Sequence, residues 1–169
     1  MSATSLLDEV IEAHGGAERW QTVSELSVDV SAGGFAVASK FQRRGLLDLV
    51  ARVSTDLQHV VLAPYPSRGQ RGVFDRGAVR IETDNGTLVR QRLDPRAELS
   101  SPRHLLWWDH LDLLYFGGSA LWTYFTSPFI FASPRFQVQA LDPWPEQGEI
   151  WRPLEVTFPA ELHLSLIHI

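Results

Sequence analysis

The sequence contains no cysteine, and Lys40 is the only lysine among 15 basic residues. The absence of cysteine excludes disulfides, thiolate catalysis, cysteine-ligated zinc and iron–sulfur clusters. The net charge of −5 provides no general basic surface that would attract nucleic acid or acidic lipid. The G-x-S-x-G, P-loop, G-x-G-x-x-G and H-E-x-x-H patterns are also absent from the sequence. We therefore expect no cofactor, no bound metal and no nucleic-acid partner.

The two ends of the chain give separate expectations. The stretch MSATSLLDEVIEAHGG carries Asp8 and Glu9 where a secretory signal has a positive end and an apolar run, which predicts a cytoplasmic protein. The final LSLIHI is what a common sequencing-library adapter encodes in one reading frame. We interpret residues 164–169 as a non-native tail and residues 1–163 as a single domain that is truncated at its C-terminus. An ordinary C-terminal strand is the alternative interpretation of the tail.

Residues 5–14 are predicted to form an amphipathic helix. An S-x-x-D capping pattern begins at Ser5, apolar residues then recur at helical spacing, and Gly15 with Gly16 ends the pattern. Residues 17–23 are predicted to add a short second helical turn. With 169 residues, the chain is long enough for one domain with a hydrophobic core.

From Glu25 onward apolar residues alternate with polar ones, which is typical of half-buried strands. Because the intervening turns are short, we expect an antiparallel meander. The turn signals are Gly33-Gly34, Asp75-Arg76-Gly77 and Asp84-Asn85-Gly86. The predicted strands span residues 25–32, 35–41, 46–54, 58–64, three short pieces between 71 and 92, 136–143 and, with an interruption at Pro153, 148–159.

The most aromatic part of the chain is residues 105–131, LLWWDHLDLLYFGGSALWTYFTSPFIF. Residues 113–132 carry no charge and are long enough for a membrane span. The glycine pair, the hydroxyl side chains, Pro128 and the lack of a basic flank favour instead two short helices, 104–116 and 119–126, separated by Gly117 and Gly118. We therefore expect no transmembrane segment, and we expect these helices to cover the sheet.

The large side chains of this segment have two interpretations. A helix that is apolar on nearly every side requires burial on more than one side, which favours core packing. Large aromatic residues that a sheet does not fully cover commonly line an apolar pocket, with tryptophan and tyrosine polar groups at its mouth. The residues predicted to contact a hydrophobic ligand are Trp107, Trp108, Leu111, Tyr115, Trp122, Phe125 and Phe129.

Three titratable residues of the same segment, Asp109, His110 and Asp112, are the candidates for catalysis or metal binding. On a helix, Asp109 and Asp112 would share one face, where two carboxylates can bind a cation or raise the pKa of one of them. An enzyme would require these side chains to converge on a pocket with a residue of the sheet, such as His59. The alternative is that they cap the helix and keep its solvent side hydrated.

The opening helix SLLDEVIEAHGGAERW, the strand ELSVDV, the hairpins GVFDRGAVRIETDNGTLV and the late strand GEIWRPLEVTFP follow one another along the chain. This order resembles the LolA-like half-barrel superfamily, the outer-membrane lipoprotein-sorting carriers of bacteria. The resemblance implies an α+β fold: a curved antiparallel β-meander (half-barrel) with an N-terminal helix, whose concave face is covered by the helical aromatic insertion. It also implies a protein of the cell envelope that holds acyl chains between the sheet and the helices.

The sequence supports three hypotheses for function. The first is non-catalytic binding of a hydrophobic, acyl-chain or lipid-like ligand in a cavity between the curved sheet and the helices. The second is a small hydrolase or metal-dependent enzyme that uses Asp109, His110 and Asp112. The third is a structural or protein-interaction domain whose aromatic patch binds another protein. We favour the first, because the aromatic segment is extensive and no catalytic motif is present.

Overall fold

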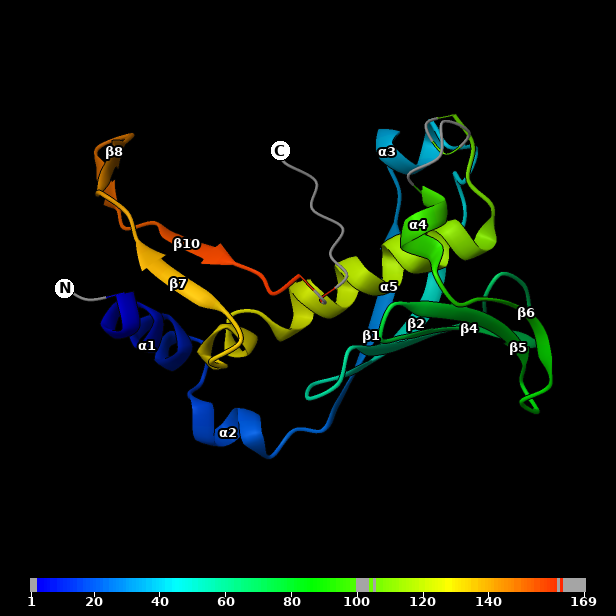
Figure 1. Cartoon of the computed structure of the whole chain (residues 1–169), viewed down its shortest axis with the longest axis horizontal. Helices are drawn as coiled ribbons and strands as arrows, with labels where there is room; N and C mark the ends of the chain where they lie inside the picture. The colour runs from blue at the N-terminus through cyan, green and yellow to red at the C-terminus, as the bar shows by residue number, and fades with distance from the viewer. Residues whose placement is uncertain (1–2, 100–103, 105, 161, 163–169) are drawn as a thin grey trace. The chain divides into compact units, whose positions relative to one another are not determined.

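A computed structural model describes residues 3–99, 104, 106–160 and 162 of the chain (Figure 1). The predicted tail at residues 164–169 lies outside the described residues. The described chain divides into two compact units: one runs up to Val23 and resumes at Thr126, and the other runs from Ser24 to Phe125. Helices and antiparallel strands both occur in the chain, so the predicted α+β class is confirmed.

The unit formed from both ends of the chain combines short helices with small sheets. Strand β7 (Gln137–Ala140) pairs with β10 (Leu154–Thr157), and β8 (Trp144–Glu146) pairs with β9 (Glu149–Trp151), both antiparallel. The helices are α1 (Ala3–Ala13), α2 (Ala17–Gln21) and the 3-10 helix η2 (Phe129–Ala132). The helix predicted at residues 5–14 is therefore present, and it begins slightly earlier than expected.

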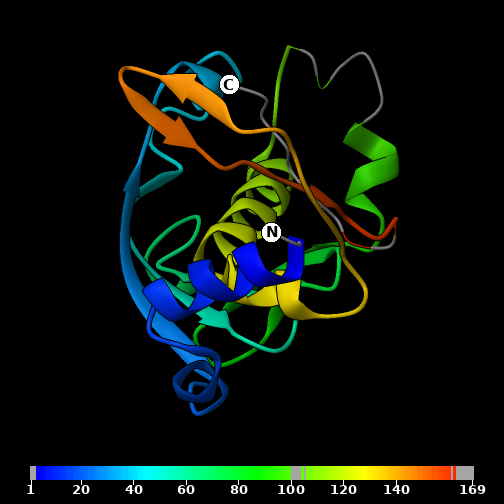
Figure 2. The ribbon, with the colours of Figure 1, turned by 90° about the vertical axis from the view of Figure 1, so that its left-hand side faces the viewer.

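Apolar side chains of α1 and an aromatic cluster fill this unit. Leu6 and Ile11 are buried, and α1 lies against β7, β10 and η2 (Figure 2). Phe131, Phe136 and Phe158 pack edge to face, with ring centroids between 5.1 and 5.7 Å apart. Because this is a favoured arrangement for aromatic pairs, the cluster joins η2 to the ends of the β7–β10 pair.

The other unit is built on a six-stranded antiparallel sheet in which each strand pairs with the next along the chain. The strands are β1 (Glu25–Ala32), β2 (Leu46–Ser54), β3 (His59–Ala63), β4 (Gln70–Asp75), β5 (Ala78–Thr83) and β6 (Leu88–Arg92). Because β1 and β6 each pair on one side only, the sheet is open rather than a closed barrel. The predicted meander is confirmed over these strands.

The turn between β4 and β5 shows why neighbouring strands pair. Arg76 and Gly77 have φ angles of 47° and 90°. Positive φ at both central residues is what a type I′ turn requires, and the twist of that turn matches the twist of the flanking strands. The D-R-G sequence therefore sets the register in which Asp75 pairs with Ala78.

The strand predicted over residues 35–41 is wrong. After the glycine pair the chain forms the short helix α3 (Phe35–Ala38), in which the Ala38 N–H donates to the Gly34 carbonyl at 3.0 Å. Val37 is buried, whereas Phe35 and Phe41 are exposed. Alternate residues of FAVASKF are apolar, but a stretch this short does not distinguish one helical turn from a strand by periodicity.

The aromatic segment forms one continuous helix, α5 (His110–Thr126), so the predicted break at Gly117 and Gly118 is wrong. The structure describes both glycines, and neither has the positive φ of a helix end. They allow close approach instead. A Cβ at Gly118 would lie 2.5 Å from the Cβ of Phe74 on β4, and a Cβ at Gly117 would lie 3.2 Å from the side chain of Leu46 on β2. Helix α5 therefore packs directly on the sheet (Figure 1).

Helix α4 (Pro95–Leu99) follows β6 and precedes the segment that leads into α5.

Helix α5 has 17 residues, and a transmembrane helix needs about 20 mostly apolar residues. Across the described residues, no helix combines the length and the hydropathy needed to cross a membrane.

Candidate functional site

The candidate catalytic residues Asp109 and Asp112 form a capping box at the start of α5. Oδ1 of Asp109 accepts the N–H groups of Leu111 and Asp112 at 2.8 and 3.0 Å. In return, Oδ2 of Asp112 accepts the N–H of Asp109 at 2.9 Å. These bonds satisfy backbone donors that the start of a helix leaves without intrahelical partners. The D-H-L-D sequence thus begins the helix at His110, which corrects the predicted start at residue 104.

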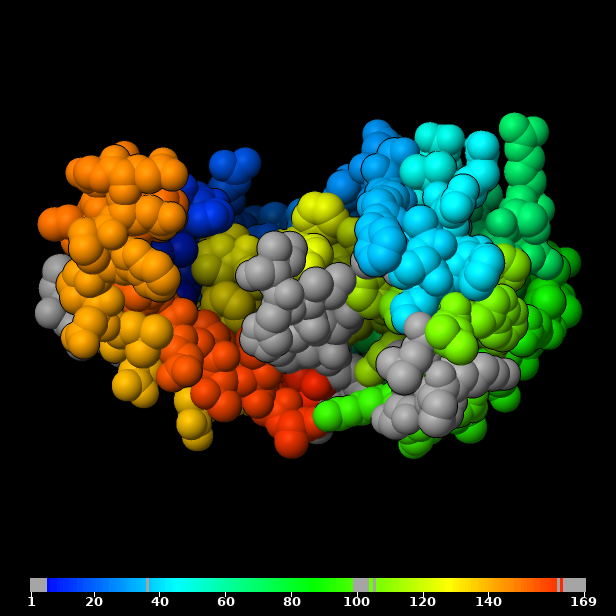
Figure 3. All heavy atoms as spheres, turned by 90° about the horizontal axis from the view of Figure 1, so that it is seen from above, coloured from blue at the N-terminus to red at the C-terminus, as the bar shows by residue number. Residues whose placement is uncertain are grey.

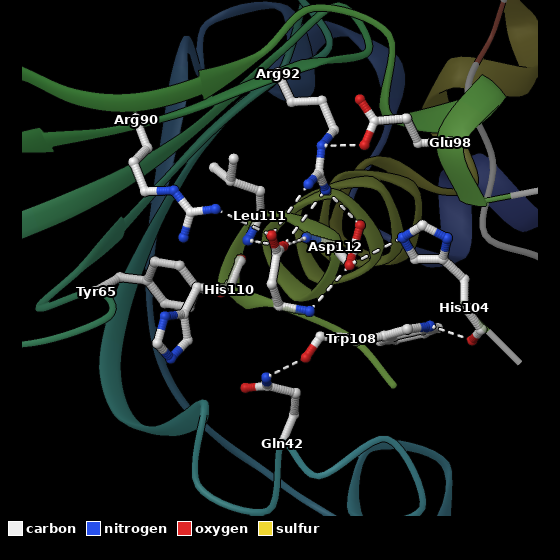
Figure 4. A network of polar contacts seen from close by, with 11 residues as sticks. Gln42, Tyr65, Arg90, Arg92, Glu98, His104, Trp108, His110, Leu111 and Asp112 are labelled. Atoms are coloured by element: carbon white, nitrogen blue, oxygen red, sulfur yellow. Dashed lines mark hydrogen bonds and ion pairs between the residues drawn. The ribbon is translucent and has the colours of Figure 1, made fainter. Parts of the chain in front are cut away.

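Arg92, the last residue of β6, contacts both carboxylates from the sheet (Figure 4). Its Nη1 lies 2.5 Å from Asp112 Oδ1, its Nη2 lies 3.0 Å from Asp109 Oδ2, and its Nε lies 2.8 Å from Glu98 Oε2. Arg90 adds a contact to Asp109 Oδ2 at 3.2 Å. Because the Arg92 side chain is only 10% exposed, this guanidinium joins β6, α4 and α5 largely out of water.

A second set of contacts surrounds Asp112, whose side chain is fully buried. Nε2 of His104 lies 3.2 Å from Asp112 Oδ2, and the His104 side chain is also buried. Nε1 of Trp108 donates to the His104 carbonyl at 2.9 Å, and Nε2 of Gln42 donates to the Trp108 carbonyl at 2.6 Å (Figure 4). The segment before α5 is therefore tied to the loop that follows α3.

These surroundings shift the two carboxyl groups in opposite directions. Burial raises the pKa of Asp112, and the charge of Asp109 adds to that effect. Burial also acts to raise the pKa of Asp109, but the bond from the Asp112 N–H and the charges of Arg92 and Arg90 outweigh it and hold that pKa below its ordinary value. The surroundings therefore favour the charged form of Asp109 and disfavour that of Asp112.

The geometry of this cluster favours a structural role. Both oxygens of Asp109 and both oxygens of Asp112 already accept a hydrogen bond or an ion pair. His110 is exposed, and His59 lies 3.8 Å from Asp75 rather than joining the cluster. Among the described residues, no group of three or more histidine and acidic side chains could hold a metal ion. The cluster fixes where α5 begins relative to β6.

Three of the predicted ligand contacts lie in the core. Leu111 and Trp122 are buried. Tyr115 is buried too, and its ring meets Phe74 edge to face with centroids 6.0 Å apart. Burial also raises the pKa of Tyr115. The core-packing interpretation of the aromatic segment thus describes these three positions.

The other predicted ligand contacts are more accessible and belong to two different units. Trp107 is 43% exposed, and Trp108 and Phe125 are half-buried. Phe129 belongs to the unit of the chain ends, where it stacks on Trp20 with centroids 4.2 Å apart. Trp107 and Trp108 therefore present accessible aromatic surface just before α5, and their contact with a ligand stays a prediction.

An open hollow of about 400 Å³ lies beside the start of α5, lined by residues 41–45, Pro66 and His110. Figure 3 shows the cyan surface that includes the loop after α3 beside the lime-green surface near the start of α5. The wall at His110 is anchored because the Tyr65 hydroxyl donates to the His110 carbonyl at 2.5 Å. The local sequence does not predict this hollow, because three segments far apart along the chain form it. Its one local signal was the pair Arg43-Arg44.

Phe41, on the rim of the hollow, occupies a backbone position that favours glycine. Helix α3 ends with the Phe41 N–H bonded to the Ala38 carbonyl and the Gln42 N–H bonded to the Val37 carbonyl, which is a Schellman motif. Phe41 has φ of 64°, and the corresponding residue at the end of α1 is Gly15 with φ of 106°. A bulky residue in this conformation costs on the order of 1–3 kcal/mol. The Phe41 side chain is 76% exposed, so core packing does not offset that cost.

Comparison with known proteins finds no match to the chain among protein-family models, curated proteins or solved structures. The function is therefore inferred from the contacts described above.

Proposed function

We propose that the chain is a non-catalytic binder of a hydrophobic, acyl-chain-like ligand, and that the ligand occupies the hollow beside the start of α5. The observation that carries this proposal is Phe41, whose exposed ring stands in an unfavourable backbone conformation on the rim. Burying an aromatic side chain stabilises by roughly 1.5–3 kcal/mol. Contact between an apolar ligand and the Phe41 ring would therefore offset the cost of the positive φ, whereas contact with water does not.

The close packing of α5 places limits on where an acyl chain could lie. A Cβ at Gly72 would come within 2.6 Å of Tyr65 and 2.7 Å of Leu114, and Gly118 is equally close to Phe74. The middle of α5 therefore leaves no room for a ligand against β4. The hollow beside the start of α5 has a volume of about 400 Å³, which falls in the range of small-molecule pockets, about 300–1,000 Å³.

We also propose that the chain has the fold of the LolA-like superfamily. An open meander with a helix packed on one face is compatible with a LolA-like half-barrel, in which a curved sheet would turn its concave face toward the helix. The acyl chains bound by that superfamily support the same class of ligand. The half-buried Trp108 accepts a hydrogen bond from Gln42, which lines the hollow, and its ring would add apolar surface at the edge of the hollow.

Displacement of a fluorescent fatty acid from the full chain, together with native mass spectrometry, tests the proposal. We expect displacement at micromolar concentrations and a bound lipid in the mass spectrum. Replacing Phe41 by Asn should weaken binding about fivefold, because losing roughly half the burial of one aromatic ring is worth about 1 kcal/mol. Asparagine tolerates positive φ better than phenylalanine, so this variant keeps the loop conformation.

Leu57→Asn is the matched control. Leu57 is 52% exposed in the turn between β2 and β3, while the hollow lies at the opposite ends of these strands. This variant should bind the probe as the unchanged chain does. The proposal is contradicted by an absence of both displacement and bound lipid, or by equal losses in the Phe41 and Leu57 variants.

A second candidate function, a protein-interaction domain, is favoured by the hairpin β8–β9. Trp144, Ile150 and Trp151 are between 58% and 74% exposed, and the two tryptophans face each other across the strands. Exposed apolar groups gathered in this way commonly mark an interface. Light scattering over a range of concentrations should then detect self-association that Trp144→Ser with Trp151→Ser removes; a chain that is monomeric throughout would count against self-association.

A further inference from the structure

We propose that the hollow beside α5 binds an anionic head group, a carboxylate or a phosphate, through Arg43 and Arg44, so that the ligand is an anionic amphiphile. This inference rests on the proposed function, since it names the polar end of the same ligand. It assigns to the arginine pair a role that the net charge of −5 does not suggest.

The charge of the hollow is the first support. None of the described residues that line it is acidic, whereas Arg43 and Arg44 each carry a positive charge. The carboxylate of Asp109, which is next to His110 in the sequence, is bonded to Arg90 and Arg92 and to the backbone of α5. The hollow therefore concentrates positive charge on a chain with a net negative charge.

The arginines themselves are available. Both are exposed, and no ion pair joins either guanidinium to an acidic side chain within the described part of the chain. Other arginines show the contrast: Arg92 contacts three carboxylates, and Arg71 contacts Glu82 at 2.8 Å. A guanidinium presents a planar set of donors that matches carboxylate and phosphate oxygens. The guanidinium groups of Arg43 and Arg44 are therefore able to bind an anion, whereas those of the ion-paired arginines already contact carboxylates.

The loop that carries the arginines is held in place at both sides. On one side, Gln42 donates to the Trp108 carbonyl at 2.6 Å, and Trp108 N–H donates to the Lys40 carbonyl at 3.3 Å. On the other, the Leu47 N–H donates to the Arg44 carbonyl at 3.3 Å as β2 begins. A fixed backbone lowers the entropy that a flexible loop would lose on binding.

The apolar neighbours of the arginines indicate an amphiphile rather than a free anion. Phe41 and Pro66 line the same hollow as Arg43 and Arg44. A free phosphate would leave the Phe41 ring in water, whereas a chain attached to the head group would cover it. The two sources of the same anionic chemistry are therefore separable by experiment.

Binding of four probes to the full chain tests the inference: laurate, dodecyl phosphate, dodecanol and inorganic phosphate. Displacement of the fluorescent fatty acid measures each one. We expect laurate and dodecyl phosphate to bind about tenfold or more tightly than dodecanol, a factor that corresponds to about 1.4 kcal/mol. Inorganic phosphate should compete far more weakly than dodecyl phosphate.

The double variant Arg43→Gln with Arg44→Gln should bind the anionic probes and dodecanol with similar affinity. Because both side chains are exposed, it should unfold at the same temperature as the unchanged chain. The control Arg19→Gln with Arg52→Gln removes the same charge from exposed positions that do not line the hollow, and it should keep the preference for anions.

Each of the other outcomes overturns one part of the inference. If dodecanol binds as tightly as laurate, or if the double variant keeps the preference, the anionic head-group site is wrong while hydrophobic binding stands. If inorganic phosphate binds as tightly as dodecyl phosphate, the ligand is a free anion and not an amphiphile. If none of the probes with a dodecyl chain binds, the proposed function itself fails.

Discussion

Replacing Gly118 by Ala tests whether α5 runs unbroken against the sheet. In a helix without tertiary contacts, this change stabilises by about 1 kcal/mol. Here the new methyl group would lie 2.5 Å from Phe74 Cβ and 2.7 Å from Phe74 Cγ. These atoms adjoin the backbone of β4, and Phe74 is fully buried, so the ring cannot move aside. Overpacking of this kind costs about 1–3 kcal/mol, and we expect a net loss of about 2 kcal/mol.

Gly117→Ala is the matched control, because it adds the same methyl group to the adjacent position of the same helix. A Cβ at Gly117 would lie 3.2 and 3.4 Å from the two methyl carbons of Leu46, which are the far end of a flexible side chain. Small adjustments of Leu46 relieve this contact. We expect the free energy of unfolding to stay unchanged or to rise by up to about 1 kcal/mol.

Thermal unfolding followed by circular dichroism measures both variants. For a chain of this size, about 2 kcal/mol lowers the Tm by roughly 4–8 °C, so Gly118→Ala should unfold clearly earlier than Gly117→Ala. Equal effects would refute the reasoning. A helix that ended at the glycine pair would be penalised by a side chain at its left-handed end position, and a helix remote from the sheet would gain stability from both substitutions.

Substitutions at three further residues test the contacts around α5 and in the sheet. Asp109→Ala should destabilise by about 1–3 kcal/mol in urea unfolding, because it removes both a helix cap and an arginine partner, whereas Asp109→Asn should lose less because asparagine also caps. Tyr65→Phe should destabilise by about 1 kcal/mol through loss of its bond to the His110 carbonyl, an effect absent if that bond does not form. Hydrogen bonds from Arg80 and Arg71 hold the pKa of the Glu82 carboxyl below its ordinary 4.5. The stability that the ionised carboxylate contributes is therefore present above pH 4.5 and is lost as the pH falls through the folded pKa. Glu82→Gln should therefore destabilise by about 1–2 kcal/mol at neutral pH and by progressively less in acid; a difference that does not change with pH would contradict this.

The sheet was predictable because its signals are local. Alternation of apolar and polar residues identified β1 and β2 within short stretches, and the Arg76-Gly77 turn fixes its own partner strands. The same reasoning fails at residues 35–41, where the alternation is real but too brief. There the positive φ of Gly34 and the helical bonds that follow it decide the structure, and neither can be read from the apolar pattern.

Gly117 and Gly118 show a different limit of the sequence. A glycine pair in an apolar helix is equally consistent with a helix end and with close contact to another element. The choice depends on Leu46 and Phe74, which come from strands far away along the chain. Only the tertiary arrangement separates the two, because the local sequence is the same in both.

The candidate site divides along the same line. That Asp109 and Asp112 cap a helix was one of the alternatives in the sequence, since their D-x-x-D spacing is local. The role of Arg92 was not predictable, because its local sequence does not indicate which carboxylates its guanidinium contacts. Phe41 lies between these cases. Its conformation becomes visible only in the structure, where a phenylalanine occupies a position at which the end of α1 has glycine, and the proposal of a ligand in the hollow rests on that observation.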